Sequence, residues 1–87
     1  MGYIRKLNDR VNIVGSNLKR IRKAKKLSQS DVCTKLALLG VTMYVADIYE
    51  IEHNKRFVKD FELKALCMAL EITFEELFDN TNKYFEH

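Results

Sequence analysis

The sequence predicts an all-α fold, and three observations support this expectation. The 87 residues include no proline and three glycines, so few positions would interrupt a helix. Apolar residues recur at helical spacing from about residue 13 onward. At 47% hydrophobic residues, the chain has enough apolar surface for one compact core. We expect a single domain at residues 13–79, an N-terminal arm at residues 1–12, and a C-terminal tail at residues 80–87 that is a candidate dimer-forming segment.

The first helix is expected at about residues 13–26. Val14, Leu18 and Ile21 recur at positions i, i+4 and i+7, which places them on one stripe of a helix. Basic residues fall largely outside that stripe, so the helix should be amphipathic and basic. These residues are Lys19, Arg20, Lys23 and Lys26.

The second helix is expected at about residues 28–39. Ser28 and Asp31 have the spacing of a capping box, in which each side chain accepts a hydrogen bond from the backbone of the other residue. Gly40 supplies a C-terminal stop, because glycine readily adopts the left-handed conformation found there. Four residues should face the core: Val32, Cys33, Leu36 and Leu39.

The third helix is expected at about residues 43–53, centred on Ile48. Stepping about 100° per residue puts Tyr44, Ile51 and Glu52 on or near the core side. Asn54 follows, and asparagine tolerates the left-handed conformation at a helix end. The opposite side then presents four outward residues: Ala46, Tyr49, Glu50 and His53.

Two more helices complete the prediction. Asp60 is placed to cap a fourth helix that runs to about residue 70. Thr73 and Glu76 repeat the capping-box spacing ahead of a short fifth helix. The fourth helix should direct four residues inward: Leu63, Leu66, Cys67 and Leu70.

Charge is unevenly distributed along the chain, whose formal net charge is +3. Residues 1–26 hold nine lysines and arginines against one acid, whereas residues 27–87 hold six against eleven acids. Such asymmetry indicates a polyanionic partner, although a solvated helix face is an alternative explanation.

The sequence disfavours several classes of protein. A zinc site would have to recruit Cys33, Cys67, His53 and His87 from distant positions, and a structural disulfide is also not expected. We expect no metal, no cofactor and no small-molecule ligand. There is no glycine-rich phosphate loop and no clustered acid pair, so we expect no enzymatic activity. No secretory signal or membrane-spanning run is visible, which favours a cytoplasmic protein without membrane association.

The residues resemble the phage-repressor or Cro-like (Xre-type) helix-turn-helix DNA-binding domains. The matching segments are "LKRIRKAKKLSQSDVCTKL", "IYEIEHNKR" and "KDFELKALCMALEITFEELF", in this order, within about residues 13–79. The resemblance implies a five-helix, lambda-repressor-like domain. The sequence departs from the family pattern in a longer link between the second and third helices and at three positions: Cys33 for a small alanine, Tyr44 for serine or threonine, and Asn54 for glycine.

The resemblance implies a function and assigns roles to residues. The chain would be a transcriptional regulator that binds double-stranded DNA, typically a repressor, and acts as a homodimer on a near-palindromic site. An ion pair between Arg22 and Glu52 would join the first and third helices. The residues that would contact DNA phosphates are Ser28, Gln29, Lys55 and Arg56.

The outward side of the third helix is the candidate for reading bases. Val45 and Ala46 could contact thymine methyl groups, Tyr49 a phosphate or base edge, and Glu50 the N4 amine of cytosine. Gln29 is expected to be exposed and free to reach a phosphate.

Affinity would come from surrounding lysines and arginines, because phosphate contacts position a protein and base contacts specify the sequence. Weaker contributors by long-range attraction are Lys19, Lys23, Lys25 and Lys26.

Two questions stay open from sequence alone. The apolar and acidic character of "YVADIYE" also suits a protein-interaction module that keeps the fold and binds DNA weakly or not at all. Apolar residues near the C-terminus could either mediate dimerisation or fold back on the domain. These residues are Phe78, Tyr84 and Phe85.

Overall fold

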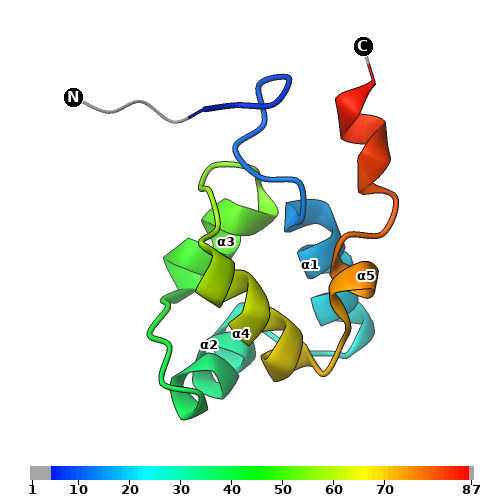
Figure 1. The fold of residues 1–87 in the computed structure, drawn as a ribbon. Helices are drawn as coiled ribbons and strands as arrows, with labels where there is room; N and C mark the ends of the chain where they lie inside the picture. The colour runs from blue at the N-terminus through cyan, green and yellow to red at the C-terminus, as the bar shows by residue number, and fades with distance from the viewer. Residues whose placement is uncertain (1–4, 87) are drawn as a thin grey trace, which may run out of the picture.

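A computed structural model describes residues 5–86 of the chain (Figure 1). These residues form five α-helices and one 3-10 helix, joined by loops and turns. No strand occurs within these residues, where an isolated bridge pairs Leu7 with Arg10. The all-α prediction is confirmed. The elements are α1 (Gly15–Ala24), α2 (Gln29–Leu38), α3 (Val45–Glu52), α4 (Asp60–Leu70), α5 (Phe74–Leu77) and the 3-10 helix η1 (Thr81–Phe85).

Of the three capping signals found in the sequence, two form as predicted and one does not. The Asp31 amide donates to the Ser28 hydroxyl over 2.9 Å, and the Ser28 amide donates to the Asp31 carboxylate over 2.8 Å. Thr73 and Glu76 form the same reciprocal pair ahead of α5. Asp60 is not the cap of α4, because it already lies inside the helix and the Lys59 amide donates to the Glu62 carboxylate instead.

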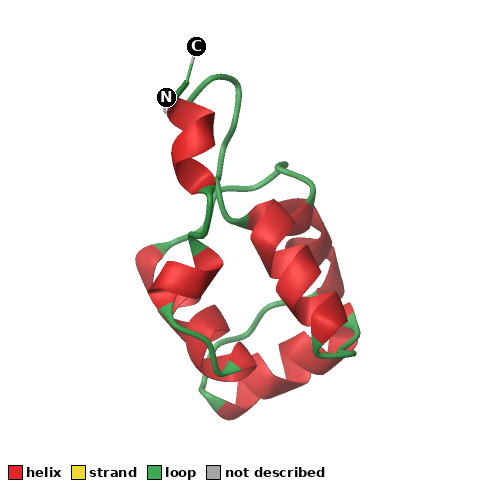
Figure 2. Ribbon diagram, turned by 90° about the vertical axis from the view of Figure 1, so that its right-hand side faces the viewer, coloured by secondary structure: helices red, strands yellow, loops and turns green. Residues whose placement is uncertain are grey.

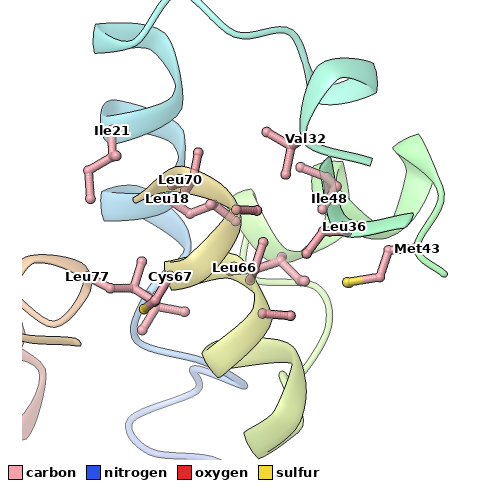
Figure 3. Packing of buried hydrophobic residues seen from close by; sticks show 14 residues of the cluster. Leu18, Ile21, Val32, Leu36, Met43, Ile48, Leu66, Cys67, Leu70 and Leu77 are labelled. Carbon is pink, nitrogen blue, oxygen red and sulfur yellow. The ribbon is translucent and has the colours of Figure 1, made fainter. Parts of the chain in front are cut away.

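The hydrophobic core lies where all five helices meet, and its side chains converge in Figure 3. Helix α4 packs against α2 and α5, while α3 packs against α1 and α2. The predicted stripe on α1 and the inward residues of α4 all pack in or against this core. The apolar residues that are at most 2% exposed are Val14, Leu18, Val32, Leu36, Ile48, Ile51, Leu66, Leu70 and Leu77.

Two residues predicted to face the core are exposed, and both lie just outside a helix. Leu39 is 41% exposed, because α2 ends at Leu38 and Val41 packs against the core instead. Tyr44 is 69% exposed, because it precedes α3 in an extended conformation to which helical stepping does not apply. The connection between α2 and α3 therefore presents large apolar side chains to solvent.

A left-handed residue follows each of the five α-helices. After α2 this residue is Gly40, with φ of 83°, and after α3 it is Asn54, with φ of 59°. Both helix ends agree with the prediction. The other three junctions use residues that carry a side chain: Lys26, Glu71 and Asn80, with φ of 57–59°.

The segment before α1 and helix η1 project together from the five-helix body (Figure 2). Asn8 donates from its side-chain amide to the Tyr84 carbonyl over 2.8 Å, and the Arg10 guanidinium lies 4.1 Å from the centre of the Tyr84 ring. Tyr84 thus folds back on its own chain, whereas Phe85 is 57% exposed. Residues 1–4 of the predicted arm and residue 87 of the tail lie outside the described residues.

Candidate nucleic-acid interface

Helix α3 is anchored by one side and exposed on the other. Ile48 and Ile51 are fully buried. The four residues predicted to read bases lie together on the outward side, where helical neighbours are three or four positions apart. Tyr49 is 44% and Val45 46% exposed, and both Ala46 and Glu50 are exposed.

A buried ion pair fixes the end of α3 to α1. The Arg22 guanidinium donates to both carboxylate oxygens of Glu52, over 2.7 Å and 3.1 Å, and to the Leu27 carbonyl over 2.9 Å. The hydrogen bonds to Glu52 raise the pKa of Arg22. The Glu52 side chain is 0% exposed, so its charge depends on these donors. The pairing expected from the family resemblance is present.

The start of α2 lies beside the end of α3. Gln29 is half-buried and donates from its side-chain amide to Glu52 over 3.1 Å. The expectation that Gln29 is exposed and has no hydrogen-bond partner is wrong. The carboxylate of Glu52 accepts hydrogen bonds from both Gln29 and Arg22. Ser28, by contrast, is exposed at the N-terminus of the ten-residue helix α2, where the helix dipole favours an anion.

Arg56 is held within the protein rather than extended into solvent. Its guanidinium forms two hydrogen bonds of 2.9 Å and 3.0 Å with Glu62 and lies 3.6 Å from an oxygen of Asp47. These hydrogen bonds from Arg56 lower the pKa of Glu62, with further help from the Lys59 amide. The two carboxylates partly compensate the charge of Arg56 and give it a structural role, while its contact with a DNA phosphate stays a prediction.

Lys55 remains an exposed cation beside the outward side of α3. Its ammonium nitrogen lies 5.8 Å from the centre of the Tyr49 ring. The other neighbour of Tyr49 is His53, whose ring stacks on it with centroids 4.0 Å apart. These contacts restrain the Tyr49 side chain and place a positive charge next to it. Ser28, Gln29 and Lys55 thus lie around the C-terminal end of α3.

Part of the basic surface of α1 faces away from α3. Arg20 lines an open hollow together with Glu75, Glu76 and Asp79. The pKa of Glu76 is lowered chiefly by hydrogen bonds from Thr73, and additionally by the charge of Lys25. Lys25 thus lies close enough to Glu76 of α5 for their charges to interact, and its long-range attraction of a polyanion stays a prediction.

Sequence reasoning missed two residues that hold α3 in place. The Asn12 side chain donates to the Ile51 and Arg56 carbonyls, over 3.0 Å and 2.8 Å, and accepts from the amides of Val14 and Gly15. Gly15 permits the close approach of α1, since a Cβ atom there would overlap the Ile51 carbonyl oxygen. The sequence did contain one signal for this arrangement, because Asn12 lies three residues before Gly15, the first residue of α1.

Neither cysteine of the chain forms a disulfide. Cys33 is half-buried and Cys67 is buried, and burial raises the pKa of both thiols. Among residues 5–86, no three His, Cys, Asp or Glu side chains are grouped so that they could hold a metal ion. His87, a candidate in the sequence, lies outside the described residues. No helix in the described part of the chain has both the length and the apolar character needed to cross a membrane.

Comparisons with known proteins return no match: no family model fits the chain, and neither the curated proteins nor the solved structures contain a significant relative.

Proposed function

We propose that this protein is a cytoplasmic, sequence-specific DNA-binding transcriptional regulator with a five-helix, lambda-repressor-like helix-turn-helix fold. Helix α3 enters the major groove, which is wide enough for an α-helix. One observation carries the proposal: Ile48 and Ile51 are fully buried while the outward side of the same two turns is exposed along its whole length. The protein acts by binding and is not an enzyme.

Phosphate contacts in this proposal come from groups around the C-terminal end of α3. Ser28 presents the N-terminus of α2, whose first-turn amides and dipole attract an anion. The hydrogen bond between Gln29 and Glu52 keeps this helix end beside α3. Lys55 adds an exposed positive charge on the same side. These contacts position the helix, and the exposed side chains of α3 discriminate between sequences.

The small number of uncompensated cations near α3 favours binding as a homodimer. Each protomer supplies few phosphate contacts, and two protomers on a near-palindromic site double them. Phe85 is 57% exposed on η1, and a symmetric contact through this end would bury it. The two half-sites bound by such a homodimer would lie about 10 base pairs apart, which is one helical turn of DNA.

Salt-dependent binding to duplex DNA tests the proposal. Fluorescence anisotropy with duplexes selected from a random pool should show affinity that falls with salt. Lys55→Ala should reduce the slope of that dependence by about 1 for each bound protomer, because one phosphate contact is lost. Lys64→Ala is the matched control, since Lys64 is exposed on α4 and should leave the slope unchanged. Tyr49→Ala should alter which sequences are selected.

A second candidate function is a protein-interaction module on the same fold. The observation that favours it is the exposed apolar surface around the connection between α2 and α3, where Leu38 is 84% and Tyr44 69% exposed. Apolar patches of this kind mark protein-interaction sites. If no duplex from the random pool binds at low salt, DNA binding is refuted and this second function is favoured.

A further inference from the structure

The residues of α3 itself include none of the side chains that proteins most often use to read purines. Guanine is read mainly by arginine or lysine, and adenine by asparagine or glutamine. The arginines and the glutamine nearest to α3 are already held by carboxylates: Arg22 and Gln29 by Glu52, and Arg56 by Glu62. The exposed residues of the helix itself are apolar, aromatic or acidic.

Glu50 is the free carboxylate of this surface. Asp47 accepts a hydrogen bond from the Tyr44 amide over 2.8 Å and lies 3.6 Å from Arg56, and Glu52 is buried in its ion pair. Glu50 is exposed and interacts with the charge of Arg56, but it has no ion pair or side-chain hydrogen bond within residues 5–86. A carboxylate accepts hydrogen bonds and donates none at neutral pH.

Among the bases in the major groove, cytosine suits such a group best. Cytosine presents its N4 amine as a donor. Adenine also presents an amine, but its N7 acceptor lies beside that amine and would repel the carboxylate. Thymine presents the O4 acceptor, and guanine presents two acceptors, so both disfavour Glu50.

Ala46 adds an apolar group next to this carboxylate. It lies four residues before Glu50, so the two Cβ atoms are about 5–6 Å apart on the same side of the helix. Val45 and Tyr49 continue the apolar surface around it, each about half exposed. In cytosine, the C5 position is adjacent to the carbon that carries N4. A methyl group on C5 would therefore lie on Ala46 while N4 donates to Glu50.

We propose that α3 reads cytosine through Glu50 and Ala46, and that it binds 5-methylcytosine more tightly than cytosine. This inference rests on the proposed DNA-binding function and names the base that the site selects. Thymine has the C5 methyl group, but its O4 atom is an acceptor and cannot donate to Glu50. Cytosine has the N4 donor for Glu50 but no methyl group for Ala46. The modified base satisfies both side chains, so the protein would respond to the methylation state of its binding site.

The test uses duplexes selected from a random pool and resynthesised with cytosine, 5-methylcytosine or thymine at each selected cytosine position. With the full chain, burial of one methyl group should tighten binding about fourfold at one position per half-site. Thymine at that position should weaken binding about tenfold or more, because its O4 faces the carboxylate.

Two variants separate the contributions of the two side chains. Glu50→Gln is nearly isosteric and should shift the preference at that position from cytosine to adenine, since glutamine can both donate to N7 and accept from N6. Ala46→Gly should remove the gain from methylation while retaining the preference for cytosine over thymine. Circular dichroism and thermal melting verify that both variants are folded.

The outcomes distinguish the inference from the function on which it rests. The reading of cytosine is refuted if methylation leaves duplex binding unchanged or weakens it. It is also refuted if Glu50→Gln keeps the base preference of the wild type. Both outcomes leave DNA binding itself intact. Failure to bind any duplex refutes both.

Discussion

Removing Arg22 should destabilise the protein strongly, because it strands the carboxylate of Glu52. In the wild type, two guanidinium hydrogen bonds of 2.7 Å and 3.1 Å satisfy this carboxylate, whose side chain is 0% exposed. In Arg22→Ala, the amide of Gln29 at 3.1 Å remains as its side-chain donor. Breaking a buried pair in this way costs about 3–5 kcal/mol, and the remaining donor favours the lower end.

That loss is large compared with the stability of a domain of this size. A chain of 87 residues is expected to unfold with a free energy of about 4–13 kcal/mol. At about 4–8 °C per kcal/mol, a loss of ~3 kcal/mol lowers the melting temperature by at least ~12 °C. Urea denaturation followed by far-ultraviolet circular dichroism measures the free energy, and calorimetry measures the melting temperature.

Two further measurements identify stranded charge as the cause. The double variant Arg22→Ala with Glu52→Gln should be less destabilised than Arg22→Ala alone, because it buries no uncompensated charge. The double variant Arg22→Met with Glu52→Leu should recover much of the lost stability, since it replaces the pair by apolar side chains of similar size. A free energy of unfolding for Arg22→Ala within about 0.5 kcal/mol of wild type would refute this reasoning.

Three other changes test the local structure. Gly15→Ala should lower the free energy of unfolding by about 3 kcal/mol, since the new Cβ atom would overlap the Ile51 carbonyl oxygen and push α1 away from α3; urea denaturation measures this. Ser28→Ala should cost about 1 kcal/mol in the same assay, because the Asp31 amide loses its acceptor. The pKa of Glu62 is lowered in the folded protein, so its contribution is complete above about pH 4.3 and is lost as the pH falls through the folded value. Glu62→Gln should therefore lower the urea midpoint at neutral pH and reduce its decline on acidification.

Each of these results has a clear contrary outcome. An unchanged urea midpoint in Gly15→Ala would mean that α1 does not need to approach α3 so closely. Wild-type stability in Ser28→Ala would show that solvent satisfies the first turn of α2 equally well. If Glu62→Gln kept the full acid sensitivity of the wild type, the protonation that unfolds the protein would occur at other carboxylates.

Local signals in the sequence predicted the helices and the orientation of α3 well. The capping pair of Ser28 and Asp31 and the apolar spacing of Ile48 and Ile51 depend on residues close together in the chain. Short-range stereochemistry decides such features, so they can be read from the sequence. The prediction that Tyr44 faces the core was wrong because Tyr44 lies one residue before α3, where helical periodicity does not apply.

Contacts between distant segments were harder to predict. The side chain of Asn12 reaches the carbonyl of Ile51, 39 residues away, and nothing in the spacing of either residue indicates this contact. The engagement of Arg56 by Glu62 depends on the path of the loop before α4, which periodicity does not describe. These packing contacts decide which cations near α3 remain free to bind a partner.

The left-handed residues after the helices have a consequence for how far this protein could be stabilised. Lys26 and Glu71 hold a conformation in which a side chain costs about 1–2 kcal/mol relative to the right-handed one, whereas glycine adopts it freely. The connections between the helices are therefore places where the domain could gain stability. Single substitutions by glycine at these two positions would therefore raise the heat resistance of the protein without any change to the residues of α3.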